Sequence, residues 1–178
     1  IFRNSSMTKE NWKVIEEKLE KITKSCMGKA LYNGLKESLK GKTLAIQFTK
    51  DKNSSFDLNG SGIRLTTAST SGDFFHEMLH AYQSYRETYD SMSSAKLNME
   101  IETHYAQYLY QSSLPEYTSD SYWKKRDMQH LRWKAIANLN NLIDRKGNLQ
   151  PNTKLYNLEL ELLNVVIPAL QSNGYPES

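Results

Sequence analysis

This sequence is short of cysteine and of long apolar runs. Cys26 is the only cysteine, so no disulfide can form within the chain, and its helical, apolar-flanked setting predicts a buried structural thiol. No run of about 18 apolar residues is present, which excludes a membrane-spanning helix. The net charge of +3, from 23 basic and 20 acidic residues, is too small and too evenly spread to indicate nucleic-acid binding.

Internal repeats, low-complexity tracts and a convincing linker are also absent from the sequence. A chain of 178 residues can bury a real core, so we expect a single domain over residues 1–178. The first residue is Ile1 rather than methionine, which indicates a processed or trimmed product. We favour a secreted or cell-envelope location over a cytoplasmic one, and the sequence leaves the oligomeric state open.

Hydrophobic periodicity predicts an α+β fold, mostly helical with a small sheet near its middle. Apolar residues at helical spacing predict helices at residues 8–24, 27–39, 73–89, 94–111, 121–143 and 151–170. Alternating and β-branched residues predict strands at 43–48 and 63–67, with a turn or loop at 51–61 between them. We expect these two strands to form a hairpin ahead of the third predicted helix.

The pentapeptide His76-Glu77-Met78-Leu79-His80 matches H-E-x-x-H, a zinc-binding and catalytic pattern. On a helix, residues four apart share one face, so both imidazoles can bind one metal ion. Glu77 follows the first histidine, where its carboxylate can take a proton from water at the metal. The pattern therefore predicts His76 and His80 as metal ligands and Glu77 as the general base.

A catalytic zinc site usually has three protein ligands, so a third is expected downstream. Glu100, Glu102 and His104 are the candidates, and His130 is more remote. Glu100 and Glu102 lie about 200° apart around a helix axis, so only one of them can face the metal. Periodicity does not choose between them, because both flank the apolar stripe of their helix.

The motif followed by Glu100-x-x-Thr103-His104 resembles the gluzincin pattern of thermolysin-like and minimal gluzincin peptidases. That resemblance covers about residues 43–111 and implies a zincin-like domain with one Zn²⁺ per chain. It makes Glu100 the third ligand, with Glu102 as the fallback, and puts His104 where gluzincins often have an aspartate that orients a ligand histidine. It also places residues 63–67 as the strand whose edge pairs with extended substrate.

The resemblance implies a zinc-dependent metallopeptidase, a hydrolase that cleaves peptide bonds with metal-activated water and Glu77 as general base. Its substrate would be a peptide or protein. The candidates for stabilising the transition state or orienting a metal ligand are His104, Tyr105 and Tyr108. Tyr110 and His130 are further candidates for stabilising the transition state.

Two other classes of function remain open at the level of sequence. One is a non-catalytic zincin-like domain that binds a metal or a partner, and the other is a helical domain in which the motif is accidental. A narrower form of the enzyme hypothesis is an effector or toxin-type metallopeptidase domain of a longer protein. The extended metzincin pattern H-E-x-x-H-x-x-G-x-x-H is absent, which argues against that branch.

Overall fold

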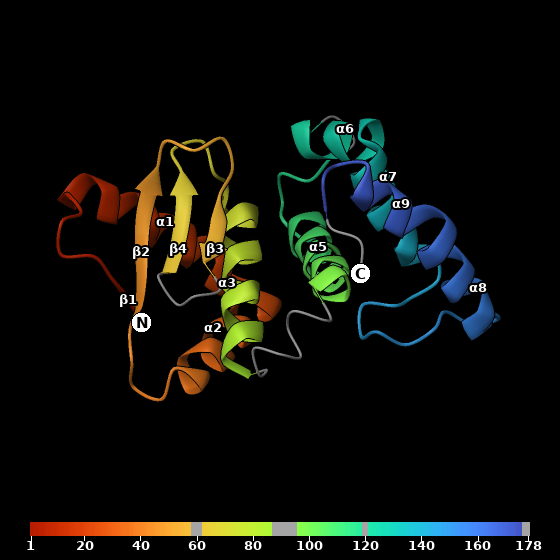
Figure 1. Cartoon of the computed structure of the whole chain (residues 1–178), viewed down its shortest axis with the longest axis horizontal. Helices are drawn as coiled ribbons and strands as arrows, with labels where there is room; N and C mark the ends of the chain where they lie inside the picture. Colours follow the sequence, from red (N-terminus) through yellow and green to blue (C-terminus); the bar gives the residue numbers. More distant parts are fainter. Residues whose placement is uncertain (58–61, 87–95, 119–120, 176–178) are drawn as a thin grey trace. The chain divides into compact units, whose positions relative to one another are not determined.

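A computed structural model describes residues 1–57, 62–86, 96–118 and 121–175, without the side chains of Tyr122 and Met128. The chain divides into two compact units, Ile1–Ser93 (unit 1) and Ser94–Ser178 (unit 2), which are coloured red to yellow-green and green to blue in Figure 1. The predicted catalytic core at residues 43–111 includes parts of both units. A single domain over residues 1–178 stays a prediction.

Unit 1 begins with strand β1 (Phe2–Arg3), helix α1 (Lys9–Lys24) and helix α2 (Cys26–Ser38). The hydroxyl of Thr8 accepts the N–H of Asn11 and caps α1, and Ser25 caps α2 by accepting the N–H of Gly28. Both helices agree with the predicted ones. Their short connection is explained by Ser25, which ends one helix and begins the next.

Cys26 is exposed, so the prediction of a buried thiol is wrong. The buried face of α2 consists of Gly28, Leu31 and Leu35. Position 26 lies about 200° around the helix from position 28, which places Cys26 on the outer side.

The sheet of unit 1 has the strand order β1-β2-β4-β3, with β2 (Leu44–Thr49), β3 (Ser55–Asp57) and β4 (Gly62–Thr66). β2 and β4 are parallel, with Ile46 beside Ile63, whereas β3 and β4 are antiparallel. The expected hairpin of residues 43–48 with 63–67 is therefore wrong. The antiparallel partner of β4 is β3, which lies in the stretch expected to be loop.

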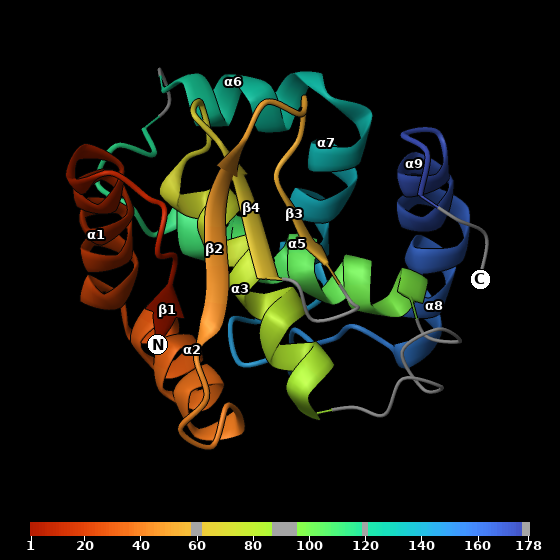
Figure 2. The same ribbon diagram turned by 60° about the vertical axis from the view of Figure 1, so that its left-hand side comes forward.

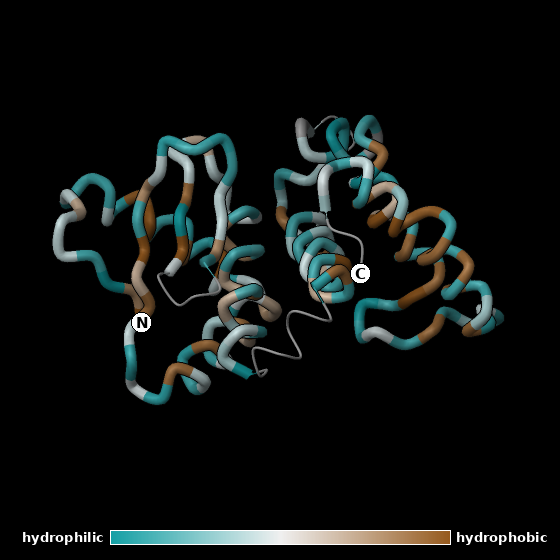
Figure 3. Tube along the Cα trace, in the orientation of Figure 1, coloured by the Kyte–Doolittle hydropathy of each residue, from teal (hydrophilic) through white to brown (hydrophobic). Residues whose placement is uncertain are grey.

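One face of this sheet is buried and the other is partly open. Leu44, Ile46, Ile63 and Leu65 are buried, while their neighbours along β2 and β4 are mostly half-buried or exposed. This is the alternation expected of a sheet covered on one side. Helix α3 (Ser71–Arg86) contacts β4, β3, α1 and α2, and Figure 2 shows it beside the sheet. Figure 3 shows hydrophobic segments along both central strands.

Unit 2 is mostly helical. Its elements are α5 (Lys96–Ser112), α6 (Tyr122–Gln129), α7 (Leu131–Asn138), the 3-10 turn η1 (Leu139–Asn141), α8 (Leu155–Glu161), the π-helical turn η2 (Leu162–Val166) and α9 (Ile167–Gln171). The single helix predicted at 121–143 is wrong, because His130 is extended, with φ −90° and ψ 127°. The last helix begins at Leu155, after Asn152 adopts a positive φ of 68°.

The core of unit 2 joins α5, α7, η1, η2 and α9 through buried apolar side chains. These residues are Leu97, Ala135, Ile136, Leu139, Val166, Ala169 and Leu170. Helices and a four-stranded sheet over the described residues confirm the α+β class. In the same residues, no helix combines the length and apolar character that crossing a bilayer requires.

A buried carboxylate in unit 2 gives a pH-dependent prediction. Asp127 is 3% exposed and accepts a 2.7 Å hydrogen bond from the Tyr117 hydroxyl. Burial raises the pKa of Asp127, against the opposing effects of Tyr117 and Arg126. The folded state therefore binds the Asp127 proton more readily than the unfolded state does. The stability that protonated Asp127 contributes is lost as pH rises above the ordinary carboxyl range. Asp127→Asn is expected to gain stability relative to the wild type between about pH 4 and pH 7.

Asp144 provides a control with the opposite sign. Hydrogen bonds from Asn148 and Lys146 hold the pKa of Asp144 below its usual value. Its stabilising contribution is lost as pH falls, so Asp144→Asn should lose stability relative to the wild type as pH rises. Urea denaturation of the wild type and both variants at about pH 4 and about pH 7 measures these differences in the free energy of unfolding. A pH-independent difference for Asp127→Asn would contradict the buried, proton-favouring environment.

Candidate metal centre

The helix that carries the H-E-x-x-H motif, α3, has a well-defined start. Thr70 Oγ1 accepts the N–H of Asp73 at 3.2 Å, and Asp73 Oδ2 accepts the N–H of Thr70 at 2.8 Å. This reciprocal pair is a capping box, with Asp73 in the position usually held by glutamate. Thr70 is therefore the cap, Asp73 closes the box, and Ser71 is the first helical residue.

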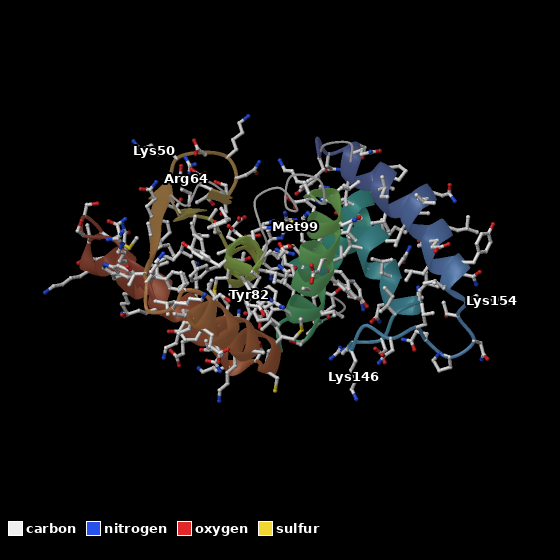
Figure 4. The ribbon with its side chains drawn as sticks, turned by 60° about the horizontal axis from the view of Figure 1, so that its bottom comes forward. Lys50, Arg64, Tyr82, Met99, Lys146 and Lys154 are labelled. Atoms are coloured by element: carbon white, nitrogen blue, oxygen red, sulfur yellow. The ribbon has the colours of Figure 1, made fainter. Side chains whose placement is uncertain are left out.

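Apolar residues fix α3 against the rest of unit 1. Phe74, Phe75, Met78 and Ala81 are all buried, with exposures of 0–2%. Tyr82, labelled in Figure 4, packs closely on α2, where a Cβ added at Gly34 would lie 2.9 Å from its ring. The helix therefore has little freedom to rotate, and the direction of its polar side chains is set by this packing.

His76 and His80 lie one turn apart on α3 and face each other. Their Nε2 atoms are 3.0 Å apart, and the rings meet edge to face at a centroid distance of 4.7 Å. Two nitrogens that each lie about 2.0–2.1 Å from a tetrahedral zinc ion are about 3.3 Å apart. The two histidines thus fit a shared Zn²⁺ with an adjustment of a few tenths of an ångström.

Gln83 fixes the orientation of His80. It lies one turn further along α3, is 7% exposed, and places Oε1 3.1 Å from His80 Nδ1. A hydrogen on Nδ1 donated to this oxygen leaves Nε2 of His80 with its lone pair, the form that binds a metal. No role for Gln83 in orienting His80 was predicted from the sequence.

Removing the Gln83 side-chain oxygen should weaken metal binding. Gln83→Ala leaves the His80 ring free to turn, and a loss of about 10- to 100-fold in zinc affinity is expected. Gln83→Glu keeps an oxygen acceptor and is the matched control, which should bind zinc at least as well as the wild type. Competition with a chromophoric chelator measures both affinities, and an unchanged affinity in Gln83→Ala would contradict the role given to Gln83.

Glu77 lies next to His76 on the same helix and is 7% exposed. Burying a carboxylate is costly unless partners or a metal compensate it. A carboxylate is uncommon at a buried position, and a functional role is one reason to keep it there. A base beside a metal site is such a reason.

The candidates for a third ligand lie on helix α5 of unit 2, where they differ in burial and in the face they occupy. Glu102 is exposed, whereas the Glu100 side chain is 14% exposed. Glu100 Oε2 lies 3.9 Å from Nε2 of His104, one turn later, and His104 is 3% exposed. Glu100 and His104 thus share a face, and Glu102 lies on a different one. Both glutamates belong to unit 2, and ligation by either stays a prediction.

The tyrosines proposed for transition-state stabilisation pack within unit 2. Tyr105 donates a hydrogen bond to the Ile143 carbonyl at 3.1 Å and stacks on Tyr108, and both rings contact the unit 2 core. Burial raises the pKa of both hydroxyls, so they stay protonated at neutral pH. The other two candidates differ: Tyr110 is fully buried, and His130 is exposed at the α6–α7 break.

The strand placed ahead of the motif helix is paired on both sides over its first half. β4 (Gly62–Thr66) pairs with β2 along Ile63–Thr66 and with β3 along Gly62–Arg64. The expectation that residues 63–67 pair with extended substrate is therefore wrong for Ile63 and Arg64, and it stays a prediction for the residues that follow. The short strand β3 is the outer strand at that end of the sheet.

Comparison with known proteins identifies no relative: no protein-family model matches the chain, and neither a protein of assigned function nor a solved structure matches it significantly. The interpretation of the motif therefore depends on the chemistry and geometry of the residues themselves.

Proposed function

We propose that this chain is a zinc-dependent peptidase. The observation that carries the proposal is the pair of Nε2 atoms of His76 and His80, 3.0 Å apart on one helix, with the buried Glu77 between them in sequence. Catalytic zinc is typically held by two imidazoles and one carboxylate, and this carboxylate is a different residue from the general base. We assign the third position to Glu100, whose carboxylate shares a face of α5 with the buried His104.

Each protein group then has a defined task. Zinc, when bound, acts as a Lewis acid that polarises a carbonyl oxygen and makes water more acidic. Glu77 takes the proton from the attacking water and delivers it to the leaving amine. Gln83 holds His80 in the metal-binding tautomer through the contact at its Nδ1. The buried helix α3 holds these groups in place before substrate arrives.

Glu77 favours an enzyme over a non-catalytic metal domain. A structural zinc site requires ligands only, and structural sites usually complete four protein ligands. A glutamate directly after the first histidine adds no ligand to such a site. The substrate class that suits an activated water and a general base is a peptide bond in a peptide or protein.

Hydrolysis of a labelled, unfolded protein tests this proposal. Zinc-loaded protein should cleave the substrate, a chelator should stop cleavage, and added zinc should restore it. A protein that binds zinc tightly yet cleaves neither this substrate nor a diverse peptide mixture would overturn the peptidase proposal. That result would favour the non-catalytic metal-binding alternative.

A further inference from the structure

A chain of polar side chains in unit 2 ends at Glu100. His104 Nε2 lies 2.9 Å from the hydroxyl of Tyr175, and Arg132 Nη1 donates to the same hydroxyl at 3.2 Å. Nε2 of His104 is also 3.9 Å from Glu100 Oε2. These four residues connect α5, α7 and the segment after α9.

Aromatic packing fixes the imidazole in this chain. The His104 ring meets the rings of Tyr175 and Trp133 edge to face, at centroid distances of 5.3 Å and 5.7 Å. The Arg132 guanidinium lies over the same two rings, 5.3 Å from the centre of Trp133 and 5.6 Å from that of Tyr175. His104 therefore has one well-defined orientation, with its Nε2 edge toward both Tyr175 and Glu100.

His104 is 3% exposed, and Arg132 and Tyr175 are half-buried beside it. A buried imidazole needs a reason, because an apolar residue of similar volume would fill the site at lower cost. Arg132 is permanently charged and donates to the Tyr175 oxygen, whose second lone pair can accept an N–H from Nε2 of His104, the edge that also faces Glu100. The ordered ring then limits the positions that the Glu100 carboxylate can take. Partners of this kind orient metal ligands in many sites.

We propose that Tyr175, held by Arg132, positions the Glu100 carboxylate for the metal through His104. The inference rests on the proposed function, because it takes Glu100 as a zinc ligand. It adds positioning residues that lie 32 and 75 positions beyond Glu100 in the sequence. Neither Tyr175 nor Arg132 contacts substrate in this scheme, so both are positioning residues.

The test compares Tyr175→Phe with Tyr117→Phe in the full chain. Both substitutions keep the ring and remove one tyrosine hydroxyl in unit 2. The Tyr175 hydroxyl contacts His104 and Arg132, whereas the Tyr117 hydroxyl bonds to Asp127. We expect Tyr175→Phe to weaken zinc binding by about 10- to 100-fold and to shift the visible bands of the Co²⁺-loaded protein. Tyr117→Phe should leave both readouts unchanged, even where it lowers the melting temperature as much.

Wild type and Glu100→Ala complete the experiment and separate the possible failures. Wild-type affinity and an unshifted cobalt spectrum in Tyr175→Phe, alongside weakened binding in Glu100→Ala, would overturn the inference and leave the proposed function intact. Unweakened binding in Glu100→Ala would overturn the inference by removing the ligand that it positions. Absence of zinc and cobalt binding in the wild type would overturn both proposals.

Discussion

Glu77→Gln is expected to lower kcat/KM for peptide hydrolysis by about 10²- to 10⁴-fold while the protein keeps its zinc. Glutamine has nearly the same shape as glutamate but cannot accept a proton at neutral pH, so only the base is lost. The metal ligands, the helix and the packing of α3 stay as they are. Steady-state kinetics and metal analysis on the same preparation measure both quantities.

Glu17→Gln is the matched control for this variant. Glu17 is exposed on α1 of unit 1, away from the motif helix in sequence, and the same substitution there should leave hydrolysis and zinc content unchanged. Wild-type activity in Glu77→Gln would contradict the general-base role. Loss of zinc together with activity would instead give Glu77 a part in holding the metal.

Gly62→Ala is expected to lower the free energy of unfolding by about 3 kcal/mol. Gly62 has a φ of +116°, which side-chain-bearing residues rarely adopt, and an added Cβ would lie 2.2 Å from the carbonyl oxygen of Ala45. That oxygen belongs to β2, the parallel neighbour of β4. The alanine therefore has to push two central strands apart as well as strain its own backbone.

Gly147→Ala separates these two costs. Gly147 also has a positive φ, of +82°, but an added Cβ there meets nothing within 4 Å. Only the backbone strain remains, so a loss of about 1 kcal/mol is expected. Urea denaturation measures both variants, and equal losses would contradict the close parallel approach of β2 and β4.

Local sequence signals predicted several elements of this fold. The helix at 8–24 followed from apolar periodicity, which depends only on neighbouring residues. Strand pairing depends on distant residues, so the parallel pairing of β2 with β4 and the short strand β3 were not predicted. The break at His130 was missed for another reason, because neither glycine nor proline marks it.

The candidate site shows the same division between local and distant signals. His76, Glu77 and His80 were recognisable because their spacing within five residues carries the chemistry. Gln83 could have been assigned from its place one turn after His80. Tyr175 gave no signal at all, because it lies 71 residues from its hydrogen-bond partner His104.

Zinc content is the measurement that tests the proposed metal centre most directly. Mass spectrometry of the wild type, Glu100→Ala and Glu102→Ala after reconstitution should find about one zinc per chain in the wild type and in Glu102→Ala. Glu100→Ala should lose most of its zinc. Equal zinc in the two variants would contradict the assignment of Glu100, and a wild type without zinc in excess metal would contradict the metal centre itself.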